Sequence, residues 1–199
     1  MRLTKVAEAD FPTEFGVFRI YGFEGRSGDR VEEAVVLKMG DLGGAVPPLV
    51  RIHSQCLTGD VFHSLRCDCR AQLEISLNSI AQEGRGLVIY EHQEGRGIGL
   101  LNKLRAYELQ DQGADTVEAN ERLGFDSDLR SYELPVAIIR YFGLNSVRLL
   151  SNNPEKVAAV ESAGIQVAAR VPCLADIVDT RQAYLRTKKE KMGHLLEDF

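Results

Sequence analysis

The chain has 199 residues, enough for one domain with a sizeable hydrophobic core. Its 44% apolar and 27% charged residues are typical of a soluble globular protein, and no apolar run approaches the ~20 residues that span a bilayer. The net charge of -5 argues against nucleic acid as a partner, since such binding relies on a basic surface. The first residues lack the apolar core of a signal peptide, so we expect a cytoplasmic protein with no membrane partner.

The first third of the chain is predicted to be rich in β-strands. Alternating apolar residues over 13–23 predict a strand or hairpin, and residues 33–39 and 48–53 predict two further strands. The segment 41–44, which holds two glycines, predicts the turn between the last two.

The rest of the chain alternates helices with strands. Apolar periodicity and end signals predict helices over 70–83, from the glycine-rich segment 94–99 to about residue 110, over 133–141, from 154 to near 164, and over 176–196. Short apolar runs predict strands over 86–90, 146–150 and 165–169. No linker or repeat interrupts the pattern. The sequence therefore predicts an α/β fold: a single domain over residues 1–199, with a mixed β-sheet, flanking helices and a β-rich N-terminal third.

Three of the four cysteines, Cys56, Cys67 and Cys69, lie close together in the sequence. A reducing cytosol disfavours disulfides, so this clustering indicates a metal site. Thiolates are the ligands that zinc prefers, and three of them leave one tetrahedral position open, where the metal can activate water. The sequence therefore predicts a catalytic zinc site.

Two other interpretations of these cysteines are open at this point. A closed structural site would need a fourth ligand from His53, His63 or Cys173, none of which has a characteristic spacing. Simple burial of three reduced cysteines fits poorly, because polar and charged residues lie between them.

Three further features favour binding of an anion. The segment 94–99, Glu-Gly-Arg-Gly-Ile-Gly, follows a predicted strand and opens a helix, where backbone N–H groups and Arg96 can meet negative charge. The segment 151–156 is a capped helix start that carries Lys156, and Arg51 lies on the strand leading to the cysteines. Each feature alone is ordinary structure, but beside a metal site they suggest a polyphosphate or nucleotide.

These motifs resemble GTP cyclohydrolase II, the zinc enzyme that opens riboflavin biosynthesis. The resemblance covers nearly the whole chain and rests on residues 51–60, 64–69, 93–100, 103–107, 115–120, 149–154 and 191–196. It implies hydrolysis of GTP to formate, pyrophosphate and 2,5-diamino-6-(5-phospho-ribosylamino)pyrimidin-4(3H)-one. It also implies one zinc ion per subunit, magnesium with the triphosphate, and a homodimer.

The resemblance also assigns roles to individual residues. It makes Cys56, Cys67 and Cys69 the zinc ligands, Asp128 a proton acceptor, Arg130 a nucleophile toward the α-phosphate, and Tyr107 a participant in ring opening. The residues that it places in contact with GTP are Arg51, Ile52, His53, Ser54, Gln55, Gln72, Glu94, Gly95, Arg96, Thr116, Ser151 and Lys156.

Two positions depart from the family pattern. Gln55 stands where the family usually has glutamate, and it cannot carry a proton, so acid–base work falls to Glu94, Asp128 or Tyr107. Ser151 replaces a usual threonine but keeps the hydroxyl.

Two alternatives to full activity remain open: a homologue that stops at the formamide because of Gln55, and a zinc-stapled binding module without catalysis. The fused synthase domain of some members is absent from this sequence, which indicates a single activity.

Overall fold

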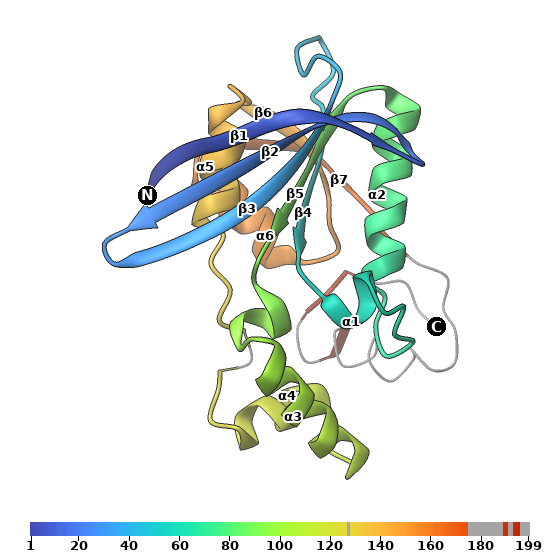
Figure 1. Ribbon diagram of the computed structural model, residues 1–199, viewed down its shortest axis with the longest axis vertical. Coiled ribbons are helices and arrows are strands. Elements are labelled where there is room, and N and C mark those ends of the chain that lie inside the picture. Colours follow the sequence, from blue (N-terminus) through green and yellow to red (C-terminus); the bar gives the residue numbers. More distant parts are fainter. Residues whose placement is uncertain (127, 175–188, 191–192, 196–199) are drawn as a thin grey trace.

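The computed structural model describes residues 1–126, 128–174, 189–190 and 193–195. A seven-stranded mixed sheet forms its centre, in the order β1-β2-β3-β5-β4-β6-β7 (Figure 1). Its strands are β1 Arg2–Thr13, β2 Gly16–Ser27, β3 Arg30–Met39, β4 Leu49–Ser54, β5 Gly86–Glu91, β6 Ser146–Leu150 and β7 Gln166–Val171. The first three strands pair antiparallel, and β3 pairs antiparallel with β5. The pairs β4–β5, β4–β6 and β6–β7 are parallel.

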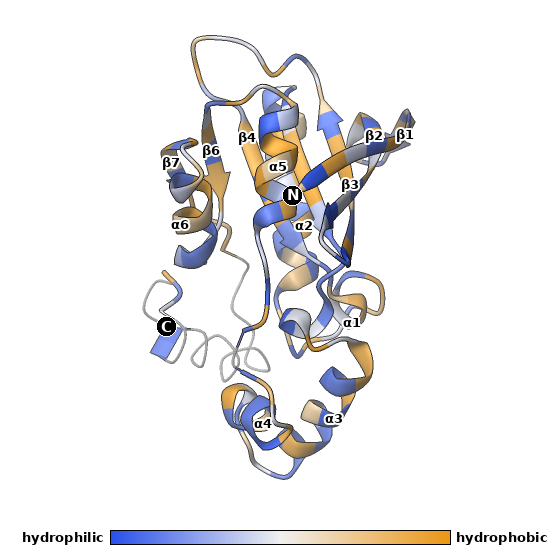
Figure 2. Cartoon of the chain, turned by 90° about the vertical axis from the view of Figure 1, so that its left-hand side faces the viewer, coloured by the Kyte–Doolittle hydropathy of each residue, from blue (hydrophilic) through white to orange (hydrophobic). Residues whose placement is uncertain are grey.

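Helices cover both faces of the parallel part of this sheet. They are α1 Leu57–Asp60, α2 Cys69–Glu83, α3 Leu100–Asp111, α4 Thr116–Arg122, α5 Glu133–Tyr141 and α6 Pro154–Ser162, with a 3-10 turn η1 over Glu94–Gly97. Side chains of α2 pack with Leu49 and Val88, whereas α5 and α6 pack with Val50 and Ile52 on the opposite face. Figure 2 shows apolar residues concentrated where α5 lies over the sheet. None of the described helices is long and apolar enough to span a membrane.

The parallel strands set the position of the polar residues. Because side chains alternate along β4, Val50 and Ile52 enter the core under α5 while Arg51 and His53 face α2. The carboxyl ends of β4, β5 and β6 lie at the same edge of the sheet, where α1, α3 and α4 also lie (Figure 1). In open α/β sheets ligands bind at this edge, so the fold gathers the residues that follow these strands at one place.

The predicted fold class is confirmed, and most elements lie within a few residues of their predicted bounds. The predicted strand or hairpin at 13–23 is wrong in its limits: it joins the end of β1 to most of β2. No strand was predicted before residue 13, because β1 is exposed over almost its whole length and lacks a buried face. The helix α4 was also not predicted, although Asp115 and Glu118 form the capping box that starts it. The predicted helix over 176–196 lies almost entirely outside the described residues.

Candidate active site

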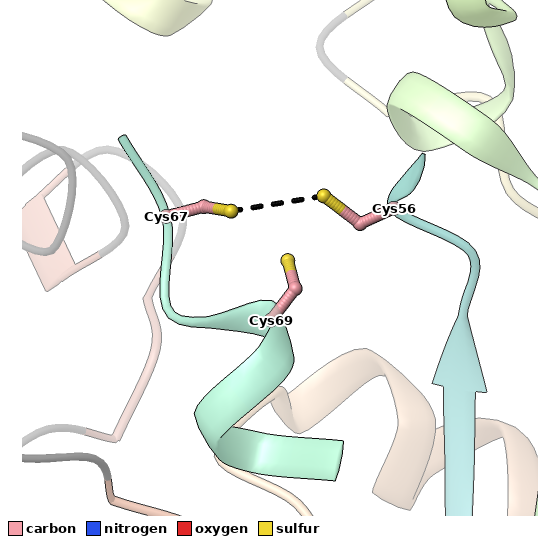
Figure 3. Close-up of side chains that lie close together, drawn as sticks. All are labelled: Cys56, Cys67 and Cys69. Carbon is pink, nitrogen blue, oxygen red and sulfur yellow. Dashed lines mark hydrogen bonds between the residues drawn. The ribbon is translucent and has the colours of Figure 1, made fainter. Parts of the chain in front are cut away.

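The three clustered cysteines meet at the carboxyl edge of the sheet and form what we call the cysteine cluster. Cys56 follows β4 and caps α1, while Cys67 lies just before α2 and Cys69 is its first residue. Their sulfur atoms all lie within 4.8 Å of one another, and 3.7 Å separates those of Cys56 and Cys67 (Figure 3). Hydrogen bonds from the other two thiols and the charge of Lys103 lower the pKa of Cys56. The three sulfurs are therefore close enough together to share one metal ion.

Local geometry leaves room at the cysteine cluster for an ion. Gly59, in α1, has no side chain where an added Cβ would lie 2.7 Å from the Cys67 sulfur and 3.1 Å from the Cys56 sulfur. The carboxylate of Asp60 accepts a hydrogen bond of 3.0 Å from the Cys56 backbone N–H, which fixes the turn that carries this ligand. The donor set of three sulfurs suits zinc.

None of the three candidates for a fourth protein ligand joins the cysteine cluster. The His53 Nε2 atom lies 3.2 Å from both carboxylate oxygens of Asp60, and the Cys173 thiol contacts the Gln72 carbonyl oxygen at 3.4 Å. His63 is exposed. In the described part of the chain, no other His, Cys, Asp or Glu completes the group. The geometry thus agrees with three protein ligands and an open position, the pattern of catalytic zinc sites.

The cysteine cluster opens into a pocket that gathers nearly all of the predicted site residues. Ile52 is an exception, because its side chain is fully buried in the core under α5 and only its backbone faces the polar side. Asp128 does not line the pocket either and acts on it through Arg130. The predicted residues that line it are Arg51, His53, Ser54, Gln55, Cys56, Cys67, Cys69, Gln72, Glu94, Gly95, Arg96, Tyr107, Thr116, Arg130, Ser151 and Lys156.

A second group in the pocket consists of Arg51, Arg130 and Lys156, which we call the cation group. The Arg51 guanidinium donates to the Leu150 carbonyl oxygen at 2.9 Å and to Gln72 Oε1 at 2.6 Å. The Lys156 ammonium donates to the Ile52 carbonyl oxygen at 2.8 Å. Burial and then repulsion from Arg130 and Arg51 lower the pKa of Lys156.

Several donors around the cation group have no partner within the described structure. These are Arg51 Nε and both terminal nitrogens of Arg96. Arg96 is also one of two non-glycine residues with a positive φ (61°) among those described, and it follows Gly95, whose φ is 62°. Buried donors without partners cost free energy unless a ligand supplies acceptors, so these nitrogens are available to an anion in the pocket.

Arg130 forms a close ion pair with Asp128. Its Nε atom lies 2.9 Å from Oδ1 and 3.0 Å from Oδ2, and a further bond joins its terminal nitrogen to Oδ2. Burial alone would raise the pKa of Asp128, but the hydrogen bonds and charge of Arg130 outweigh it and lower this pKa. The same pairing outweighs burial at Arg130 and raises its pKa. The pair is therefore ionised, with Arg130 a cation.

Tyr107 connects α3 to the cysteine cluster. Its hydroxyl lies 3.2 Å from Thr58 Oγ1, and Thr58 Oγ1 lies 3.7 Å from the Cys56 sulfur. Burial raises the pKa of Tyr107. Lys103, one turn earlier on α3, places its Nζ atom 3.1 Å from the Cys56 sulfur.

Comparison with known proteins agrees with this site. A family model described as GTP cyclohydrolase II matches residues 4–172. A GTP cyclohydrolase-2 from Escherichia coli (strain K12 / DH10B) is 53% identical over 196 residues, which are 98% of this chain and 99% of the relative. One from Shewanella amazonensis is 49% identical over 198 residues, 100% of this chain and 96% of the relative. The chain belongs to the GTP cyclohydrolase II family.

A weaker structural likeness adds nothing to this assignment. It is to a two-domain 3,4-dihydroxy-2-butanone 4-phosphate synthase from A. baumannii, with a TM-score of 0.48 and 18% identity over 87% of this chain and 40% of the other.

Polar residues outside the predicted set also lie at or beside the site of this GTP cyclohydrolase II family member, and Lys103 and Glu91 are two of them. Lys103 was noted only as part of a motif, although its spacing of four residues from Tyr107 places both on one face of a helix. Glu91, which is 1% exposed at the end of β5, accepts hydrogen bonds from Ser54 Oγ at 3.1 Å and from Gln93 Nε2 at 3.2 Å. The sequence signal that could have pointed to Glu91 is its position as a charged residue at the end of an apolar strand.

Proposed function

We propose that this chain hydrolyses GTP and opens the imidazole ring of its guanine. The products are formate, pyrophosphate and 2,5-diamino-6-(5-phospho-ribosylamino)pyrimidin-4(3H)-one, in the first step of riboflavin biosynthesis. One observation carries the proposal: a single pocket is lined by three clustered sulfurs and by three basic side chains, two of which, Arg51 and Lys156, are buried. A nucleoside triphosphate offers both partners, a base carbon open to attack by water and a chain of anionic phosphates.

The cysteine cluster would hold one zinc ion in this reaction. Bound there, zinc supplies a Lewis acid that activates water for addition to the guanine ring carbon and to the resulting formamide. Tyr107 lies beside this position with its hydroxyl 3.2 Å from Thr58, and its raised pKa keeps the phenol protonated for donation during ring opening. Gln55 lines the pocket and can only hydrogen-bond, so we assign proton transfer to Glu94, Tyr107 and Asp128.

The cation group would bind the triphosphate together with Arg96. Their donors without partners match the acceptors that phosphate oxygens offer, and arginine can pair with phosphate in a bidentate way. Magnesium with the triphosphate would share this charge, as in other phosphoryl-transfer sites. Because Asp128 raises its pKa, Arg130 would act on the α-phosphate as a cation, and a nucleophilic role would first require proton loss to Asp128.

Contacts with the rest of GTP follow from the same pocket. We assign them to Ile52, through its backbone, and to the side chains or backbone of His53, Ser54, Gln72, Gly95, Thr116 and Ser151. Burial first, and then the charge of Arg51, lower the pKa of His53, which favours a neutral imidazole. We further propose that residues 1–199 act as one domain in a cytoplasmic homodimer, with GTP rather than nucleic acid or membrane as the partner.

Product analysis tests this function directly. The purified protein is incubated with GTP, zinc and magnesium, and formate and pyrophosphate are measured together. Equal amounts of the two support the proposal. Pyrophosphate without formate would instead support a second candidate, a homologue that stops before formate release because Gln55 lacks a proton to give. Binding of GTP with neither product would leave a nucleotide-binding module.

A further inference from the structure

Lys103 brings a positive charge to the cysteine cluster from α3. Its Nζ atom lies 3.1 Å from the Cys56 sulfur and 2.7 Å from Glu94 Oε1. The side chain is 12% exposed, and its stem passes so close to Gly95 that an added Cβ there would lie 3.2 Å from the Lys103 Cβ. The ammonium is therefore held between a carboxylate and a sulfur.

Glu94 fixes this ammonium because its own carboxylate is fixed by the backbone. Its Oε2 atom accepts a hydrogen bond of 2.6 Å from the Leu57 N–H, directly after Cys56 in the chain. Its Oε1 atom accepts one of 3.1 Å from the Gly95 N–H, in addition to the bond from Lys103. The position of Lys103 relative to the sulfur is thus set by α1, η1 and α3 together.

The neighbouring arginines in the sequence do not take the place of Lys103 at the cysteine cluster. Arg66 and Arg70, which lie beside the cysteines in the sequence, bond instead to Asp111 and Glu74. Arg105, the next cation on α3, is exposed and bonds to Asn102. Lys103, unlike these arginines, is placed to affect a thiolate directly.

We propose that Lys103 is a positioning residue that offsets the charge of the cysteine cluster and weakens the electron donation of Cys56 to the metal. Three thiolates carry one more negative charge than a zinc ion neutralises, and the Lys103 ammonium, which is shared with the Glu94 carboxylate, offsets part of it. A charged hydrogen bond to a thiolate withdraws electron density from sulfur, so the metal remains a stronger Lewis acid. The inference rests on the metal site of the proposed function.

Cobalt(II) in place of zinc tests this inference without GTP, since its thiolate-to-metal absorption band reports the electron density on sulfur. We expect Lys103→Met to shift this band to longer wavelength and Lys103→Arg, whose cation is more dispersed, to shift it less in the same direction. Arg105→Met removes a cation from the same helix without touching a sulfur, so its band should match the wild type. Circular dichroism checks that each variant is folded.

Each outcome bears on one of the two proposals. A wild-type protein without a thiolate-to-cobalt band would overturn the metal site and, with it, this inference. A normal wild-type band that Lys103→Met leaves in place would overturn the role of Lys103 alone. If Lys103→Met does not fold or take up cobalt, Lys103→Gln, which also removes the charge, decides the question, because an unshifted band there has the same meaning.

Discussion

The cysteine cluster and the cation group line the same pocket but are assembled differently. All members of the cysteine cluster come from one stretch of chain between β4 and α2. The cation group comes from three distant places: Arg51 on β4, Arg130 before α5 and Lys156 on α6. The first group therefore depends on local backbone geometry, and the second depends on the pairing of strands and the docking of helices.

The two groups also differ in how their charge is balanced. Lys103 contacts the cysteine cluster, which remains short of positive charge until a metal is present. In the cation group, Arg130 and Lys156 both lie over the Tyr132 ring, at 5.8 and 5.7 Å from its centroid, and repulsion lowers the pKa of Lys156. We therefore expect a ligand of opposite charge to complete each group, a metal ion for one and an anion for the other.

Removing a sulfur should abolish the function of the cysteine cluster altogether. Cys67→Ser replaces a soft thiolate by a poor zinc ligand, so we expect bound zinc and formate release to fall to background. Metal analysis of the purified protein and a formate assay measure the two effects. Cys173→Ser is the matched control, because Cys173 is equally buried but lies outside the cluster. Full activity of Cys67→Ser without zinc would overturn the catalytic role of the metal.

Lys156→Met should disable the cation group and leave the cysteine cluster intact. Loss of one partner of a buried charged hydrogen bond costs about 2–5 kcal/mol, so we expect pyrophosphate affinity to fall roughly thirtyfold or more. Zinc content should not change. Thermal stability without ligand should not fall, because a buried cation that faces two arginines is removed. Calorimetric titration measures the affinity, and exposed Lys5→Met is the control. Unchanged affinity would exclude Lys156 from the anion site.

Gly59→Ala should damage the cysteine cluster by sterics alone. The added Cβ would lie 2.7 Å from the Cys67 sulfur, closer than real contacts allow, so the sulfurs must move apart. Displaced ligands weaken a metal site, and we expect zinc affinity to fall roughly tenfold to a hundredfold. Competition with a chelator measures this. In Gly22→Ala the added Cβ meets nothing within 4 Å, so this variant should bind zinc normally. Normal affinity in Gly59→Ala would show that the cluster tolerates rearrangement.

The same contrast explains what the sequence could and could not predict. The cysteine cluster was predictable because its ligands are near neighbours in the chain, and cysteine chemistry is specific. The partners of Lys103 and Glu91 were not, because they depend on the contact of α3 with α1 and on the pairing of β5 with β4. Sequence similarity named Ile52 as a site residue, but only the sheet shows that its side chain lies in the core.

The missed elements have a similar cause. β1 carries no buried face, so its extended form comes from pairing with β2 rather than from apolar alternation. The helix α4 is short, with buried Ala119 and Asn120, and gives little helical periodicity beyond its capping box. A capping box alone is a weak signal in the sequence compared with the tertiary contacts that hold α4 in place.

The remaining prediction concerns the pH dependence that is set by Glu91, the carboxylate beside the cation group. Burial raises its pKa to about 7, against a smaller opposing effect of Lys156, and Ser54 joins the two side chains with contacts of 3.1 and 3.4 Å. The folded protein therefore holds this proton more tightly than the unfolded chain, whose ordinary glutamate pKa is 4.5. Its contribution to the free energy of unfolding is complete below that value and is lost as the pH rises through about 7.

Glu91→Gln should remove this part of the pH dependence. One pKa unit corresponds to about 1.4 kcal/mol, so the wild type should lose up to about 3 kcal/mol between about pH 5 and about pH 8 from this residue. Glutamine keeps the shape and cannot ionise, so its variant should show a flatter decline in urea unfolding. Glu108→Gln, on the exposed side of α3, should decline like the wild type. An equally steep decline in Glu91→Gln would mean that the Glu91 side chain is ionised throughout this pH range. Lys156 and Arg130 would then keep its carboxylate charged, and the cation group would carry a permanent counter-charge.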